Sequence, residues 1–373
     1  MTDVLDWATG DPGRAPGIAA TAGAGAGGVD GTAETARIVH ELAARRRAHA
    51  RRVVVVLLVV LVAVMAVRIL LGRYTITVPD FLAILGGAQI PGATFVVMED
   101  KLPRAVLGAL AGFAFGASGA LFRRVLGNPL ASPDILGIAH GASAGAVAGM
   151  ALWGLRGVAL IPAALIGSAV ALAIVLLASA GRHTGIVGQR FLLGGVAVAA
   201  LGTAVVTQLM ARLTLDGAQE AAVWTVGSLA GASGQRISWL AVTLILLIPV
   251  GMWLHAALRP AELGPELAVG LGSRPAPTRA AALGVGTMLA AAATAVAGPL
   301  AFVALLSTPI ATALGRGRPR LITAALVGAV IVVAADIVAS EALGTVDLPT
   351  GVVTGALGAP AMLWILLRSR KVI

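Results

Sequence analysis

Long apolar runs, separated by arginines or by proline- and glycine-containing breaks, constrain this chain more than any other feature. The first run covers 53–71, and the second, 105–122, lies between Arg104 and the pair Arg123-Arg124. About twenty apolar residues in a helix are enough to cross the hydrocarbon core of a bilayer. Only 12% of the residues are charged, about half the share expected of a soluble domain. The sequence therefore predicts an all-α protein that crosses a membrane repeatedly.

Ten runs can be counted. The eight that follow the first two lie at 135–179 (two runs), 191–213, 237–258, 280–315 (two short runs), 321–339 and 351–367. The division of 280–315 depends on a break at Gly298-Pro299, because proline cannot continue a helix through its ring. One span plus a half-helix is the alternative for this region. An even number of spans places both termini on the same side of the membrane.

The basic residues indicate which side that is. With both termini inside, 20 of the 27 Lys and Arg residues fall in cytoplasmic segments and the remaining seven fall outside. Cytoplasmic loops normally carry such an excess. A single span in 280–315 would move Arg316, Arg318 and Arg320 outside, which this bias disfavours. We therefore expect about ten transmembrane helices in the plasma membrane, with both termini cytoplasmic.

The part before the first span divides in two. Residues 1–36 are rich in Gly and Ala without an apolar core, which predicts a disordered extension rather than a signal peptide. Residues 37–52 have a helical composition and are predicted to be a basic cytoplasmic lead-in, with arginines at 45, 46, 47, 51 and 52. The ten-helix domain then covers 53–373.

Several classes of function are disfavoured. The net charge of +10 comes from basic residues at the ends of apolar runs, and no basic stripe carries interleaved aromatics as a nucleic-acid platform would. Cysteine is absent, and His140, His183 and His255 lack metal-ligand spacing. No metal or cofactor is expected. Nor do paired carboxylates or a Ser/His arrangement occur at catalytic spacing in the runs, so an intramembrane enzyme is disfavoured.

Two apolar runs carry glycine at every fourth position. These glycines are Gly108, Gly112 and Gly116 in one run, and Gly141, Gly145 and Gly149 in the next. Such ridges allow helices to cross closely within lipid. Ordinary packing is the favoured interpretation, and a seam that shifts between conformations is the alternative.

The string Asn128-Pro-Leu-Ala-Ser-Pro-Asp-Ile-Leu-Gly137 connects these two runs. Its prolines prevent helix continuation, and Ser132 or Asp134 is expected to cap the next helix. Together with Lys101-Leu-Pro-Arg104, this string resembles the FecCD-type permeases, which are the membrane subunits of ABC importers for ferric siderophores, haem and cobalamin. Further matching motifs follow in order over about 53–370, namely 224–229, 263–268, 297–303, 334–336, 348–353 and 358–360.

The resemblance implies an ABC type II importer permease architecture. Two ten-helix subunits would enclose one pathway, separate ATPase subunits would bind ATP, and an extracytoplasmic substrate-binding protein would deliver a bulky metal chelate. A ferric siderophore is the favoured cargo over haem or cobalamin. Consistent with ATP being bound elsewhere, neither Lys101 nor Lys371 lies in a Gly-x-x-x-x-Gly-Lys-Ser/Thr loop, so the chain is expected to be a transport subunit and no enzyme.

The resemblance also assigns roles to residues. Lys101 and Arg104 occupy the places of outward basic groups that meet acidic residues of the binding protein. Leu258–Gly272 matches the cytoplasmic loop that docks into the ATPase, with Glu262, Leu263, Gly264, Glu266, Leu267, Leu271 and Gly272 as coupling residues. On one helix, Glu262 and Glu266 would share a face. The candidate pathway or packing residues are Gly108, Gly112, Gly116, Asn128, Pro129, Gly298, Pro299 and Asp336.

Asp336 lies within an apolar run, where a carboxylate is costly and is usually paired or faces a cavity. A structural, hydrogen-bonded role is favoured over a proton relay. The alternative function, an ion- or proton-coupled secondary transporter, would need such a buried charge.

The sequence also departs from the family pattern. Ser307–Thr312 lacks the His and Arg that the family usually carries there, Ser340 replaces a further outward Arg of some members, and Pro265 stands where Asp is common. We therefore expect a heterodimer, in which an unlike permease subunit retains these groups, rather than a homodimer.

Overall fold

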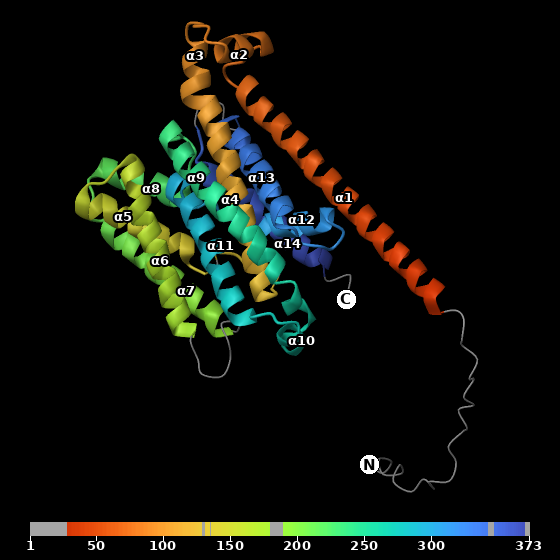
Figure 1. Ribbon diagram of the computed structural model, residues 1–373. Coiled ribbons are helices and arrows are strands. Elements are labelled where there is room, and N and C mark those ends of the chain that lie inside the picture. The colour runs from red at the N-terminus through yellow and green to blue at the C-terminus, as the bar shows by residue number, and fades with distance from the viewer. Residues whose placement is uncertain (1–27, 129–130, 135, 180–188, 342–346, 370–373) are drawn as a thin grey trace, which may run out of the picture. The chain divides into compact units, whose positions relative to one another are not determined.

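The computed structural model describes residues 28–128, 131–134, 136–179, 189–341 and 347–369, and these form helices without any strand among them (Figure 1). The helices are α1 (Gly28–Leu70), α2 (Val78–Leu85), α3 (Ala93–Phe95), η1 (Val96–Lys101), α4 (Leu102–Leu126), α5 (Ile138–Trp153), η2 (Gly157–Ala159), α6 (Leu160–Ser179), α7 (Gln189–Met210), α8 (Leu215–Val226), α9 (Gly234–Ala257), η3 (Pro260–Leu263), α10 (Pro265–Gly270), α11 (Pro275–Ala297), α12 (Val303–Leu314), α13 (Leu321–Glu341) and α14 (Thr350–Ser369).

The predicted spans correspond to helices α1, α4, α5, α6, α7, α9, α11, α12, α13 and α14. Within the described residues, seven helical stretches are long and apolar enough to cross a membrane, and the apolar parts of α12 and α14 are shorter. α5 has 16 residues. The predicted break at Gly298-Pro299 separates α11 from α12. The all-α, multi-pass class is confirmed.

Two compact units divide the chain between Ala50 and Arg51, close to the predicted start of the ten-helix domain at residue 53. In the first unit, residues 28–50 belong to α1. Residues 28–36 are therefore helical, although the sequence predicted disorder for them, and 1–27 lie outside the described residues. The predicted helical character of the basic lead-in agrees with the structure.

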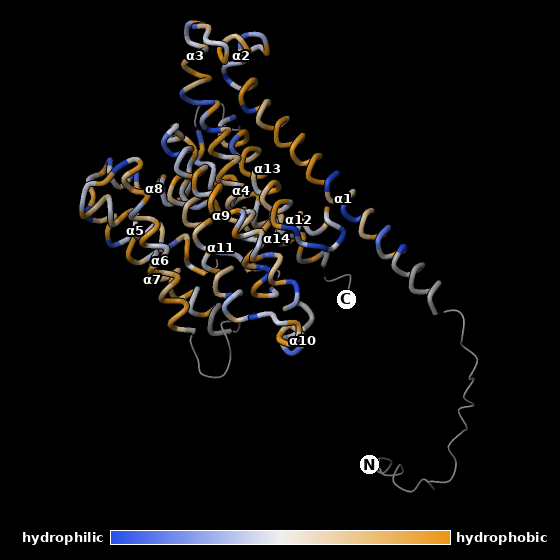
Figure 2. Tube along the Cα trace, viewed as in Figure 1, coloured by the Kyte–Doolittle hydropathy of each residue, from blue (hydrophilic) through white to orange (hydrophobic). Residues whose placement is uncertain are grey.

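Within the second unit, burial differs strongly between helices. The most apolar windows of α4, α11 and α13 are 78%, 78% and 67% buried, whereas those of α7 and α9 are each 22% buried. Figure 2 shows hydrophobic residues along these helices and hydrophilic residues gathered towards helix ends and connections. Since apolar side chains on α7 and α9 remain uncovered, lipid or another subunit must face them in the membrane.

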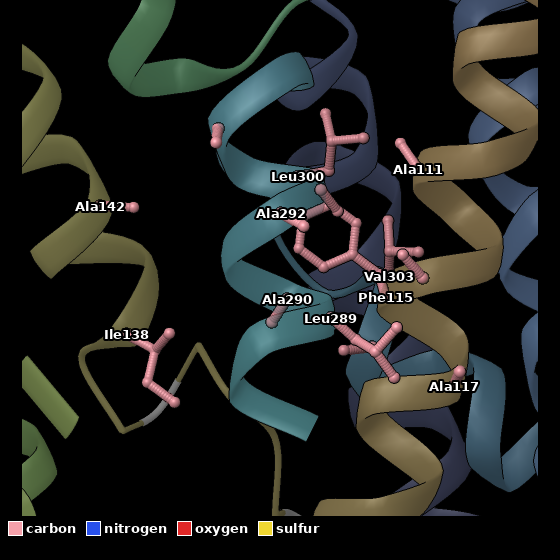
Figure 3. Close-up of a cluster of buried hydrophobic side chains, with 14 of the residues drawn as sticks. Ala111, Phe115, Ala117, Ile138, Ala142, Leu289, Ala290, Ala292, Leu300 and Val303 are labelled. Carbon is pink, nitrogen blue, oxygen red and sulfur yellow. The ribbon is translucent and has the colours of Figure 1, made fainter. Parts of the chain in front are cut away.

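The main core surrounds α4, which packs against α9, α11, α12 and α13. Phe115, Leu121 and Phe122 of α4 are fully buried. Figure 3 shows Phe115 in one cluster with Leu289 of α11 and Leu300 of the turn between α11 and α12. These large side chains fill the space between helices, while small residues elsewhere on α4 bring the backbones close together.

Candidate functional site

Asp336 of α13 is the centre of a buried ionic cluster. Its Oδ2 accepts a hydrogen bond from Arg68 Nε of α1 at 2.7 Å, and its Oδ1 accepts bonds from Arg104 Nη2 of α4 at 3.1 Å and Thr350 Oγ1 of α14 at 2.9 Å. Asp336 is only 1% exposed. A buried carboxylate is tolerated when charged and polar donors replace its water shell. The prediction that Asp336 is paired is confirmed.

Further carboxylates balance the two arginines. Arg104 Nη1 lies 3.4 Å from Asp347 Oδ2 and 3.5 Å from Asp100 Oδ1, and Arg73 Nη2 lies 3.1 Å from Asp347 Oδ1. We name this group the Asp336 cluster, and its members are Arg68, Arg73, Asp100, Arg104, Asp336 and Asp347. Its three cations and three anions cancel, so the buried charge is compensated within the chain.

Lys101 lies beside the cluster and is also buried. Its ammonium Nζ donates hydrogen bonds to the carbonyl oxygens of Leu71 at 2.7 Å and Tyr74 at 2.6 Å. Lys101 and Arg104 are each 4% exposed. The expectation that both side chains present their charge at the surface is wrong for the isolated chain, because internal carboxylate and carbonyl partners hold them inside.

A local irregularity of the helix sets the direction of these two side chains. Pro103 lacks an N–H, and its ring conflicts with the carbonyl one turn earlier in a regular α-helix. The preceding segment Val96–Lys101 is wound as a π-helix, in which Leu102 N bonds Val97 O. One π-turn inserts an extra residue and rotates the side chains that follow it. The Lys101-Leu-Pro-Arg104 motif therefore contains the proline that accounts for the π-helical segment and for the direction of its two basic side chains.

Both glycine ridges form backbone contacts between helices. A side chain at Gly112 would meet the backbone of Gly328 in α13, and one at Gly116 would meet the backbone of Ala324. The second ridge meets α6 in the same way, with Gly145 against Ala163. The packing interpretation of both ridges agrees with these contacts.

Three motifs far apart in the sequence meet at one backbone junction. Ser228 N donates to Ala297 O at 2.9 Å, and Gly351 N donates to Gly227 O, also at 2.9 Å. A side chain at Gly298 would meet the carbonyl of Trp224. The ends of α8 and α11 and the start of α14 are thus joined directly through their backbones, and the predicted pathway positions Gly298 and Pro299 lie at this junction.

The loop between α4 and α5 differs from its prediction. Gly137, in the left-handed conformation, precedes α5, and no side chain caps that helix. The proposed caps instead have buried oxygens, Ser132 Oγ and Asp134 Oδ2, for which the described residues provide no hydrogen-bond partner. Burial raises the pKa of Asp134 to about 7, because an apolar environment disfavours the charged form. Asn128 precedes this stretch, and Pro129 lies outside the described residues.

The segment 258–272 forms two short helices, η3 and α10, on either side of Gly264. Gly264 has φ 101° and Gly272 has φ 74°, a backbone region that other residues avoid. Because Gly264 interrupts the helix, Glu262 and Glu266 do not share a helical face as predicted. The side chains of Glu262 and Leu263 lie outside the described residues. Leu267 and Leu271 are 62% and 66% exposed, so this segment presents apolar side chains to its surroundings.

The sequence profile of the FecCD transport family matches residues 57–368. The chain belongs to the FecCD transport family. The resemblance inferred from the ordered motifs is confirmed.

Named relatives agree with this assignment. The chain is 35% identical over 302 residues to the ferric enterobactin transport system permease protein FepG of Escherichia coli, covering 80% of this chain and 91% of the relative. It is 38% identical over 317 residues to the achromobactin transport system permease protein CbrC of Dickeya dadantii, covering 83% and 89%. Permeases named for ferric citrate and vitamin B12 import also match.

The fold agrees as well. A solved inward-facing structure of an ABC transporter of the metal-chelate type superposes with a TM-score of 0.75 at 23% identity, covering 85% of this chain and 99% of that chain. This identity supports the fold alone. The family match and the apolar helices together show a multi-pass inner-membrane protein of a transport family.

Within the stretches that depart from the FecCD family pattern, Ser307 and Ser340 have hydrogen-bonded hydroxyl groups, whereas Thr308 Oγ1 is buried without a partner among the described residues. Ser307 Oγ donates to Ala304 O at 3.3 Å, and Ser340 Oγ donates to Ile337 O at 3.2 Å. Both residues are buried. The run 307–312 of α12 therefore holds neither the His nor the Arg of the family pattern, and Ser340 of α13 is a small side chain where some members carry an Arg.

The sequence analysis singled out only Asp336 and Arg104 here, and it missed two partners of Asp336, Arg68 and Thr350, and the Arg104 partner Asp347. Arg68 ends the first span, Asp347 precedes α14 and Thr350 begins it. The signal was available in principle, since a buried carboxylate in the FecCD fold requires donors, and Arg68 is a basic residue at the end of an apolar run. No pattern, however, indicates which of several outer arginines meets it.

Proposed function

We propose that this chain is the permease subunit of an ABC importer that carries a ferric siderophore, with ATP hydrolysed by a separate subunit. The observation that carries the proposal is the segment 258–272, in a chain of the FecCD family. It follows α9 directly, contains Gly264 and ends at Gly272, both with positive φ, and exposes Leu267, Val269 and Leu271. Exposed apolar side chains on a short helix between two spans fit a protein partner.

The coupling step follows from this geometry. Closure of the ATPase subunits would displace the segment 258–272, and the helices on either side, α9 and α11, would carry that displacement into the bundle. α11 packs on α4, α5, α6 and α9, so its movement would alter the packing of several helices together. ATP-driven rocking of this kind alternately opens a pathway to the two sides of the membrane.

Cargo is proposed from the relatives and from the residue types. Two relatives are named for siderophore systems, ferric enterobactin and achromobactin. A wide pathway lined by Gly, Ala, Ser, Thr and Met would offer the space that a bulky chelate needs. Vitamin B12 and ferric citrate, named in other relatives, are the competing cargoes that the experiment must include.

The proposed complex contains two ATPase subunits, an unlike permease subunit and an extracytoplasmic substrate-binding protein, with both termini of this chain in the cytoplasm. An unlike permease is favoured because neither the run Ser307–Thr312 nor Ser340 supplies the missing basic groups. Lys101 and Arg104 would have to leave their internal partners to contact the binding protein. A binding protein that offers carboxylates near Arg104 would compete directly with Asp100 and Asp347.

A secondary transporter remains the alternative, and it needs a carboxylate that gains and loses a proton. Asp336 accepts three hydrogen bonds, two of them from arginines. These bonds hold Asp336 against α1, α4 and α14, which fits a structural role better than a proton relay. This arrangement favours the ABC permease.

Uptake of radiolabelled ferric siderophore in a strain deleted for this chain tests the proposal. Expression of the chain with its ATPase should restore uptake, and expression with an ATPase that lacks its phosphate-binding lysine should not. An excess of unlabelled vitamin B12 should leave iron uptake unchanged. Uptake that persists with the inactive ATPase would contradict the proposal and favour the secondary transporter.

A further inference from the structure

The last turns of α9 are anchored to two other elements just before the segment 258–272 begins. Leu254 and Leu258 are each 2% exposed and belong to the main core together with Leu121 of α4 and Leu321 of α13. His255 lies on the same face and is 7% exposed. Because these buried side chains pack against α4 and α13, the end of α9 should move together with those two helices.

One polar contact stands within this apolar packing. Arg124 Nη1, near the end of α4, lies 2.8 Å from His255 Nε2, and the carbonyl oxygen of Pro319, just before α13, lies 3.3 Å from the same nitrogen. Arginine can only donate, so Nε2 accepts from Arg124, the ring proton lies on Nδ1, and the Pro319 carbonyl, which can only accept, does not bond Nε2 in this tautomer. Nδ1 is buried without a hydrogen-bond partner among the described residues. The ring is therefore oriented by Arg124.

We propose that the Arg124–His255 hydrogen bond is the joint through which displacement of the segment 258–272 reaches α4. His255 would act as a positioning residue for transport. α4 packs on α9, α11, α12 and α13, so a movement of its end is passed to most of the central helices. The inference rests on the proposed function, because it assumes that an ATPase moves this segment.

The test uses the complete complex in proteoliposomes and measures substrate transported per ATP hydrolysed. His255→Leu keeps a side chain of comparable volume and removes the acceptor, and Arg124→Met removes the donor. We expect each to lower the transport-to-hydrolysis ratio by about tenfold, since a hydrogen bond to a charged group contributes enough free energy for an effect of this size. ATPase subunits should still co-purify at wild-type stoichiometry.

Three further variants separate a joint from a purely structural contact. His255→Gln keeps an acceptor for Arg124 and should restore the ratio to within about twofold of wild type. The double variant His255→Leu/Arg124→Met should be no worse than either single variant, as expected when both act through one interaction. Arg123→Met is the matched control, because Arg123 is the neighbouring arginine on α4 and its Nη1 has no hydrogen-bond partner among the described residues.

The outcomes are distinguishable. A normal ratio in His255→Leu, or a His255→Gln variant as defective as His255→Leu, overturns the joint. Loss of assembly in both single variants assigns a structural role and also overturns it. If the wild-type complex itself transports without ATP hydrolysis, the proposed function fails, and the joint fails with it.

Discussion

The Asp336 cluster and the segment 258–272 differ in which side chains they bury and which they expose to solvent. The cluster buries its central charges, and within it Arg104 and Asp336 are 4% and 1% exposed. The segment 258–272 instead leaves apolar Leu267 and Leu271 more than half exposed. Burying a charge and exposing an apolar side chain to water are both unfavourable unless a partner compensates for them.

The difference shows which region is stabilised by contacts within this chain and which region leaves a surface for another subunit. In the cluster every described donor to Asp336 comes from this chain, so its energetics are settled by intramolecular pairing. In the segment 258–272 none of the residues that the structure describes covers the exposed leucines, which fits a surface completed by another subunit. Changes in the cluster should therefore act on stability, and changes in the segment should act on association.

The largest effect is expected from Asp336→Asn. The substitution keeps the shape but removes the charge that compensates Arg68 and Arg104, and an uncompensated buried charge costs about 3–5 kcal/mol. Thermal unfolding of the purified chain in detergent measures this loss. Thr350→Val is the control, because it removes one neutral hydrogen bond, worth about 1 kcal/mol. Equal stability of the two variants would contradict the view that charge pairing governs the cluster.

Gly112→Ala should come next. Its methyl group would press on the backbone of Gly328, and overpacking of this kind costs about 1–3 kcal/mol. Gly284→Ala in α11 is the matched control, because a methyl group there meets no atom within 4 Å. That variant should gain up to about 1 kcal/mol from helix propensity. If Gly112→Ala were also stabilising, the close contact of α4 with α13 would be disproved.

Asp134→Asn should have an effect that depends on pH. Burial raises the Asp134 pKa from its ordinary value of 3.8 to about 7, so the folded chain binds an extra proton between these values. Wild-type stability should therefore fall as pH rises from 4 to 7 and level off above 7. Because Asp134 keeps some solvent exposure, Asp134→Asn should gain only about 1–2 kcal/mol at pH 8 and little at pH 4. Unfolding measured at both pH values checks this, and an equal gain at both would refute the shifted pKa.

The smallest effect on stability is expected from Glu266→Lys. Glu266 is exposed, and surface substitutions change stability by about 0.5 kcal/mol or less. Co-purification of the ATPase should nevertheless fall, since the charge is reversed on the proposed contact surface. Glu220→Lys, the same change at another exposed position, on α8, should leave co-purification intact. Normal ATPase stoichiometry with Glu266→Lys would contradict the proposed role of the segment 258–272 in association.

Local patterns predicted some features and failed at others for identifiable reasons. The break at Gly298-Pro299 was predictable because proline acts on the residues beside it. The predicted capping by Ser132 or Asp134 was wrong because α5 begins further along the chain, after Gly137. The shared face of Glu262 and Glu266 failed because Gly264 adopts φ 101°, which spacing alone does not reveal. The prediction that Lys101 and Arg104 are exposed was wrong because most of their partners are remote in sequence.

The sequence by itself determined the membrane class, the helical spans and the family, since these depend on run length, composition and motif order. Only the tertiary structure decided what the motifs touch. Asp336 and Arg104 are separated by 232 positions, and no periodicity brings them together. The same holds for Arg124 and His255. The length of each apolar run follows from the thickness of the bilayer that the segment crosses. Ion pairs and close backbone contacts depend instead on how separate segments pack against one another.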